Sequence, residues 1–173
     1  MSFFKKIMLL ILPLTLLFSV SSCASSKTEG SSAAASSQSG VTAKQIIEAM
    51  IEKNEDANLD STAFYEDDLY KENCQKLYSI EYSDITDGGI AYAGSGGLAD
   101  EISVIKAENI SESVVETFLS KRVERRVQDF TGYKPTEISK IESSTIFSSG
   151  GFSILIISDN ALEIQEQIKN IIG

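Results

Sequence analysis

Apolar residues recur at helical spacing at both ends of the folded part of the chain. Thr42 can cap a helix and Gln45 completes a capping box, so we expect a first helix from Thr42 to about Lys53. A weaker helical pattern covers about 66–78. A long one covers about 111–133 and stops before Pro135, and a last helix begins near residue 159.

Between these helices the apolar pattern takes the shorter period of strands. Segments 89–93 and 101–106 flank a glycine-rich turn, and segments 145–148 and 152–158 flank Gly150-Gly151. The chain therefore contains two hairpin–helix units, and Val104 of the first aligns with Leu155 of the second, which suggests a repeat. We expect an α+β fold: two layers, with a roughly four-stranded, mostly antiparallel sheet and helices on one face.

The chain begins with the pattern of an export signal. Lys5 and Lys6 precede an uncharged, mostly apolar run over 7–20, which is too short to cross a membrane. The residues Val20-Ser21-Ser22-Cys23 resemble the lipobox of bacterial lipoproteins, and this resemblance implies cleavage before Cys23 and acylation of its sulfur. The alternative is an ordinary signal peptide with an incidental cysteine.

This pattern predicts three parts. Residues 1–22 are expected to be a lipoprotein signal peptide, and 23–40 the lipidated Cys23 with a flexible tether rich in Ser, Ala and Gly. Residues 41–173 are long enough for a single globular domain with one core. The predicted location is the cell membrane, with the chain lipid-anchored on the extracytoplasmic face.

Charge and composition exclude several functions. The chain has 25 acidic and 15 basic residues, a net charge of −10, which argues against a nucleic-acid partner. It has no histidine, the commonest general base and transition-metal ligand, so we expect no metal and no cofactor. Besides Cys23 there is only Cys74, so no intrachain disulfide is expected, and Cys74 is interpreted as a small buried residue.

Two arginines of the long helix are the main candidates for a site. On a helical wheel, Arg122 and Arg126 fall inside the arc of apolar positions, so both should point toward the sheet or its edge. Asp100 and Glu101, at the entry to the neighbouring strand, are the carboxylates expected to pair with them. Either the arginines form a structural ion pair, or they line a groove that holds an anionic ligand or a partner's carboxylate.

Three other patterns have a functional and a structural interpretation. The acids of 56–60, with Asp67 twelfth in the series, imitate a calcium loop, but Ser61 stands where glycine is needed, and a solvated acidic loop is the default. The loops 94–97 and 148–151 could cradle a phosphate, but hairpin turns explain them. The tyrosines of the first half could bind sugars, but are more often packing residues. They are Tyr65, Tyr70, Tyr78, Tyr82 and Tyr92.

Several short motifs resemble one known family. They are Ala99–Lys106, Arg122-Val123-Glu124, Phe130–Pro135 and Gly151-Phe152 before an aliphatic strand. Together they are similar to an uncharacterised family of bacterial lipoproteins, domain-of-unknown-function family 4358. The resemblance covers about 85–172 and implies no activity.

These observations favour a lipid-anchored extracytoplasmic lipoprotein whose domain is a non-enzymatic module. We expect it to contact the membrane through its anchor and to bind an unidentified protein or envelope component. The alternative is a carboxylate-based hydrolase that uses two of Asp84, Asp87, Asp100 and Glu101 as acid and base. A two-lobed solute receptor fits less well, because the folded part is short.

Overall fold

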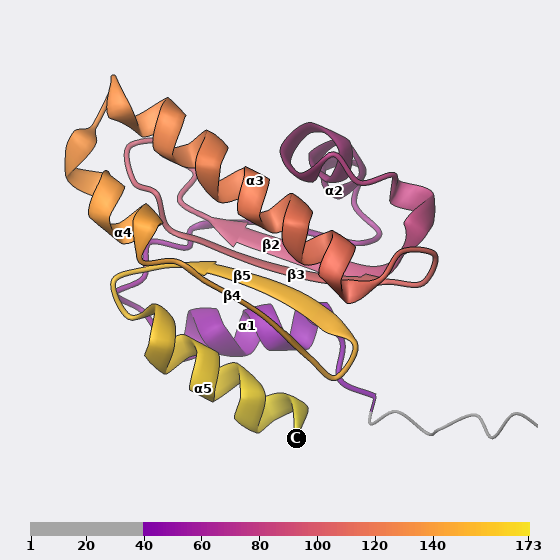
Figure 1. Cartoon of the computed structure of the whole chain (residues 1–173). Helices are drawn as coiled ribbons and strands as arrows, with labels where there is room; N and C mark the ends of the chain where they lie inside the picture. The colour runs from indigo at the N-terminus through magenta and orange to yellow at the C-terminus, as the bar shows by residue number, and fades with distance from the viewer. Residues whose placement is uncertain (1–39) are drawn as a thin grey trace, which may run out of the picture. The chain divides into compact units, whose positions relative to one another are not determined.

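The computed structural model describes residues 40–173, and the predictions for 1–39, Cys23 included, lie outside the described residues. Five strands form one antiparallel sheet in the order β1-β2-β3-β5-β4 (Figure 1). The strands are β1 (Ser61–Phe64), β2 (Ile85–Tyr92), β3 (Glu101–Ala107), β4 (Thr145–Ser149) and β5 (Phe152–Ile157). The helices are α1 (Ala43–Lys53), α2 (Asp68–Asn73), α3 (Glu112–Thr131), α4 (Ile138–Glu142) and α5 (Ala161–Ile172). Three short turns join them: a π turn η1 (Cys74–Tyr78) and the 3₁₀ turns η2 (Tyr82–Asp84) and η3 (Pro135–Glu137).

The sheet is covered on both faces. Helices α1 and α5 pack on one face, and α3, α4 and α2 lie on the other (Figure 1). The α+β class is confirmed, but the sheet has five strands, and the expectation of helices on one face was wrong. The reason is visible in β5, whose six residues are all buried, because a strand apolar on both sides needs cover on both sides.

The expected repeat is not preserved in three dimensions. Val104 packs with α1 and α5, whereas Leu155, its counterpart in the alignment, belongs to the core under α3. In the sheet Val104 pairs with Ile154 instead. Each hairpin is followed by a helix as predicted, but α3 and α5 cover opposite faces, so the two units are not arranged as copies of each other (Figure 1).

The helix cap and the glycine turn predicted from the sequence are both present in the structure. The capping box of α1 forms, with Gln45 N–H donating to Thr42 Oγ1 at 3.2 Å and Thr42 N–H to Gln45 Oε1 at 3.0 Å. The turn between β4 and β5 has φ angles of 58° at Gly150 and 83° at Gly151. Two positive φ values define the tight hairpin turn that glycine adopts most easily.

Strand β1 was not predicted, and it runs through the candidate calcium loop. Ser61–Phe64 pairs with β2, so the middle of the loop is extended. The carboxylates at its ends bond to backbone: Asp60 Oδ1 accepts from Gly94 N–H and Asp67 Oδ2 from Phe64 N–H, both at 2.7 Å. These acids therefore fix the ends of an edge strand and do not form the calcium loop.

Replacing Gly88 with alanine is expected to lower the free energy of unfolding by about 1–3 kcal/mol, because it overpacks the core. A Cβ on Gly88 would lie 2.6 Å from Cζ of Tyr70, whose side chain is fully buried. Urea denaturation measures the change. The control is Gly132→Ala at the end of α3, where a Cβ meets nothing within 4 Å and φ is −91°. Equal stability of the two variants would contradict the packing of Tyr70 against β2.

Candidate functional site

Glu101 and Arg122 form a buried ion pair between the sheet and α3. Glu101 opens β3 and is fully buried. Arg122 lies three residues after Leu119 and seven after Val115, on the stripe of α3 that packs on the sheet. Its Nη2 donates to Glu101 Oε2 at 2.7 Å, and its Nε lies 3.2 Å from both carboxylate oxygens. This forked contact is the geometry that arginine favours with a carboxylate.

Two hydroxyls complete the coordination of Glu101. Ser103 lies two residues along β3, on the same side of the strand, and donates to Glu101 Oε1 at 3.1 Å. Tyr78 donates to the same oxygen at 3.2 Å from the end of the π turn η1, which Ser79 closes with a φ of 57°. We did not predict this pair of hydroxyls, although the alternation of Glu101 and Ser103 in an otherwise apolar strand pointed to one polar stripe.

The charges of this cluster support each other. Burial alone would raise the pKa of Glu101, but the charge and hydrogen bonds of Arg122, with help from Arg126 and Ser103, hold it below its usual value. Burial lowers the pKa of Arg122, and the Glu101 carboxylate more than reverses this effect. Glu101 is therefore an anion at neutral pH and has no proton to donate as a general acid.

Arg126 forms a longer ion pair with the same carboxylate and makes no hydrogen bond to it. Its Nε is 3.9 Å from Glu101 Oε2, and this buried atom has no hydrogen-bond partner among residues 40–173. Its Nη2 donates to the backbone oxygen of Leu98 at 3.3 Å, and its guanidinium lies 4.6 Å from the centre of the Phe130 ring. Burial and the charge of Arg122 lower the pKa of Arg126, and Glu101 opposes them. The cluster thus contains two cations and one buried anion.

Asp100 does not pair with an arginine. Its carboxylate accepts from Lys140 of α4 at 2.9 Å. Lys140 also lies 3.2 Å from Glu137 and 3.4 Å from Asp159, and Glu137 accepts a hydrogen bond from Ala99 N–H at 3.1 Å. The expected pairing of Asp100 was therefore wrong. Two neighbouring residues, Asp100 and Glu101, anchor the start of β3 to two different helices.

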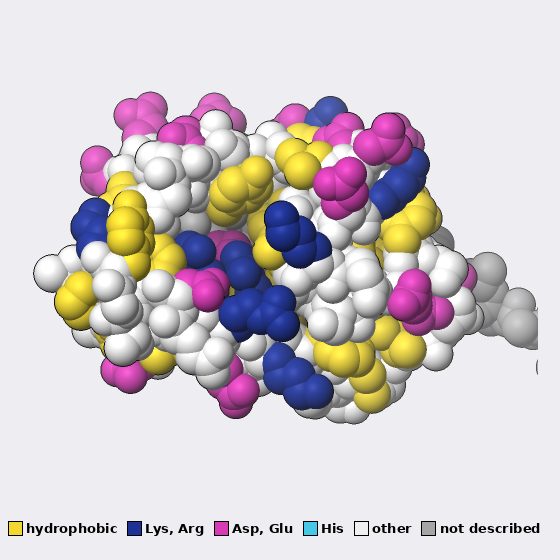
Figure 2. Space-filling view, turned by 90° about the horizontal axis from the view of Figure 1, so that it is seen from above, with side chains coloured by type: hydrophobic (Ala, Val, Ile, Leu, Met, Phe, Trp, Pro, Cys, Tyr) yellow, Lys and Arg dark blue, Asp and Glu magenta, His cyan; other side chains and the backbone are white. Residues whose placement is uncertain are grey.

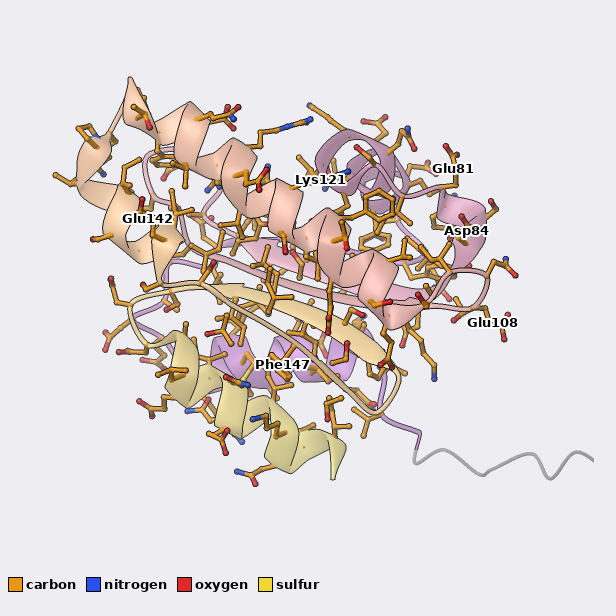
Figure 3. The ribbon with its side chains drawn as sticks, in the orientation of Figure 1. Glu81, Asp84, Glu108, Lys121, Glu142 and Phe147 are labelled. Carbon is orange, nitrogen blue, oxygen red and sulfur yellow. The ribbon has the colours of Figure 1, made fainter. Side chains whose placement is uncertain are left out.

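The four carboxylates of the hydrolase alternative lie at opposite ends of the β2–β3 hairpin. The backbone oxygen of Asp84 accepts from Glu108 N–H at 3.0 Å, about 20 Å along β3 from Glu101. Asp87 is in the same half and accepts from Ala43 N–H at 2.9 Å. Figure 3 shows Asp84 and Glu108 at one end of the domain and Glu142, the last residue of α4, at the other. The pair Asp84 and Asp87 therefore does not converge with the pair Asp100 and Glu101 on one substrate.

Most of the described domain matches one known protein family. Residues 57–158 match the family described as a domain of unknown function (DUF4358). The chain belongs to this family. The matched region contains all five strands and α2–α4, including Glu101, Arg122, Arg126 and Lys140, but neither α1 nor α5. No curated protein and no solved structure matches the chain.

The family membership predicted from short motifs is thus confirmed, and the match both begins and ends earlier in the chain than expected. The lipoprotein character associated with the resemblance remains a prediction. Within the described part of the DUF4358 chain, no helix is both long and apolar enough to cross a membrane. No three Asp, Glu or Cys side chains of that part are placed to hold a metal ion.

The remaining sequence candidates have structural roles in the DUF4358 chain. Cys74 is fully buried, and burial raises the pKa of its thiol to about 11. Tyr70 and Tyr78 are buried as well, while Tyr65 and Tyr82 stack with ring centres 4.9 Å apart. Tyr65 lines an open cleft of about 410 Å³ at the start of α1. Of the five tyrosines considered from the sequence, only Tyr65 lines that cleft.

The glycine-rich loop between β2 and β3 presents carbonyls to cations. The backbone oxygen of Gly97 accepts from Lys134 Nζ at 2.6 Å, and that of Leu98 accepts from Arg126. The N–H groups of Gly94 and Gly97 are bonded to Asp60 and Ser95. With its carbonyls turned to the basic side chains, the loop is a hairpin connection and does not have the inward N–H groups of a phosphate cradle.

Proposed function

We propose that this chain is a lipoprotein anchored through Cys23 to the extracytoplasmic face of the cell membrane, and that its domain binds a protein or another envelope component. The lipobox-like residues before Cys23 support the location. The observation that carries the binding role is the second guanidinium at Glu101, because Arg122 already neutralises that carboxylate. The remaining positive charge of Arg126 lies near the surface, where an anionic group of a partner can reach it.

Binding is favoured over hydrolysis by the state of the carboxylates. A general acid needs a carboxyl group whose pKa is raised toward the working pH. Glu101 has a lowered pKa and is enclosed by donors, and Asp100 is held by Lys140. The other two candidate acids lie at the far end of the hairpin.

Replacing Cys23 with alanine is expected to leave an unprocessed or released chain, because the sulfur is the proposed site of acylation. Wild-type chain should sediment with membranes, and its N-terminal fragment should have the mass of a diacylglyceryl-modified cysteine. The control is Cys74→Ala, which removes the other thiol and should leave both results unchanged. Normal cleavage and membrane retention of Cys23→Ala would refute the anchor.

The binding role is tested by photo-cross-linking in intact cells. A photoreactive amino acid replaces either Gln128 on α3 or Asn170 on α5, which are exposed residues on helices that cover opposite faces. A discrete cross-linked product from at least one position supports a binding module. Absence of any product from both positions, and from further exposed positions on α2 and α4, would contradict it.

A further inference from the structure

One face of this acidic molecule is basic. Figure 2 looks onto the α3 side of the domain and shows Lys and Arg side chains gathered in the middle, with most carboxylates toward the rim. We call the group of Lys76, Lys121, Arg125 and Arg126 the basic face. Lys121 and Arg125 are one helical turn apart on α3, and Arg125 Nη1 donates to the backbone oxygen of Lys76 at 3.2 Å. Figure 3 labels Lys121 on α3.

Three of the four cations of the basic face have no ion pair within the described residues, and the fourth, Arg126, shares its carboxylate with Arg122. Lys76, Lys121 and Arg125 are exposed and make no ion pair with a carboxylate of residues 40–173. The one carboxylate of residues 40–173 that forms an ion pair with Arg126 is Glu101, at 3.9 Å, and Arg122 already satisfies it. Elsewhere Lys44, Lys71 and Lys169 each pair with an acid on their own helix, whereas Lys53 and Lys134 have no ion pair with a carboxylate of residues 40–173. Of the cations of residues 40–173 that lack an ion pair, Lys76, Lys121 and Arg125 lie together on η1 and α3.

We propose that the basic face docks an acidic segment of a partner protein. This inference rests on the proposed binding function, and it names the surface and the class of partner. Cations clustered within an acidic surface attract an anionic group and orient it, since carboxylate groups elsewhere on the domain repel it. Arg125 and Arg126 each keep N–H groups beyond those bonded to backbone oxygens, and a carboxylate accepts such groups in pairs.

The neighbouring side chains favour a protein over a membrane or a phosphate polymer. Tyr133 is 68% exposed and lies edge-on to Phe130, the ring on which Arg126 rests. Exposed tyrosine next to arginine is the composition of protein interfaces, and a phosphate chain offers no apolar group to cover the ring. A flat anionic bilayer would meet the acidic rim of this face (Figure 2), whereas a narrow segment fits between the rim acids.

The surface is tested with labelled poly-L-glutamate as the probe, added to the mature full-length chain in nanodiscs of neutral lipid. Fluorescence anisotropy measures its affinity. We expect binding that weakens with salt, and about tenfold weaker binding by Arg125→Gln/Arg126→Gln. Lys44→Gln/Lys53→Gln removes the same charge from α1, on the other side of the sheet, and should change the affinity less than about twofold.

A second variant distinguishes a loss of binding from a loss of folding. Lys121→Gln/Arg125→Gln alters only exposed residues and should also weaken binding, with the melting temperature unchanged. No binding of poly-L-glutamate at low salt, or equal loss in the α1 control, would overturn the inference. Tighter binding of polyphosphate or of phosphatidylglycerol vesicles than of poly-L-glutamate would overturn the choice of a protein partner.

The cross-linking experiment separates this inference from the proposed function. Products from Gln128 that disappear in Arg125→Gln/Arg126→Gln support both. Products from Asn170 alone leave the binding function intact and place the partner on the α5 side, which would overturn the basic face.

Discussion

Replacing Arg122 with methionine is expected to lower the free energy of unfolding by about 3–5 kcal/mol. The change leaves Glu101 fully buried, with Tyr78 and Ser103 as donors but no forked guanidinium. Arg126 is 3.9 Å away and does not replace the lost hydrogen bonds. For a domain of this size the loss corresponds to a fall in melting temperature of roughly 10–20 °C, measurable by circular dichroism.

The matched control for this variant is Arg125→Met on the same helix. Arg125 is exposed and bonds only to the backbone oxygen of Lys76, so its loss should change stability by less than about 1 kcal/mol. The double variant Glu101→Leu/Arg122→Met should recover part of the loss, because it removes both charges together. A fall of a few degrees or less for Arg122→Met would show that the pair is not buried in solution.

Replacing Lys140 with methionine is expected to lower the free energy of unfolding by about 2–4 kcal/mol at pH 7. Asp100 and Glu137 are both buried and would lose their shared cation. The expected loss is smaller than for Arg122, because the third acid, Asp159, is exposed and water reaches that side. Chemical denaturation at several pH values measures it.

The pH dependence distinguishes this charge effect from a loss of packing. Burial alone would raise the pKa of Glu137, but Ala99 N–H and Lys140 lower it, so the wild type loses this stabilisation as the pH falls through the folded-state pKa. Without Lys140, burial raises the pKa of Glu137 with less opposition, so Glu137 is protonated more readily in the folded state and acid destabilises the variant less than the wild type. The difference between the two should therefore shrink from pH 7 to about pH 4. Lys169→Met, at an exposed pair with Glu166, should show no such trend.

Much of the fold follows from the sequence because strand and helix periods are local properties. The segments of β2–β5 and the long helices were predicted for this reason. Strand β1 was not, because its four residues have only one buried side chain, and the acids around it imitate a calcium loop. The placement of α1 on the face opposite α3 depends on contacts far apart in the chain. The nearly all-apolar β5, with Ser153 as its one polar residue, was a local sign that both faces are covered.

The candidate site, too, could be predicted only in part. The helical wheel placed Arg122 and Arg126 on the inner side of α3, and the polar residue at the start of the neighbouring strand identified Glu101 as a partner. The partner of Asp100 could not be inferred, because Lys140 lies on a helix of five residues whose position depends on the η3 turn before it. Short helices have little periodicity, and tertiary contacts determine which way their side chains point.

The buried thiol of Cys74 can be used to measure local opening of the domain. Alkylating reagents attack the thiolate, and this thiol is both enclosed and shifted to a pKa of about 11. A maleimide therefore reacts with Cys74 chiefly when the α2–η1 region opens. The labelling rate at increasing reagent concentration then reports how often that region, which supplies Tyr78 to Glu101, separates from the sheet.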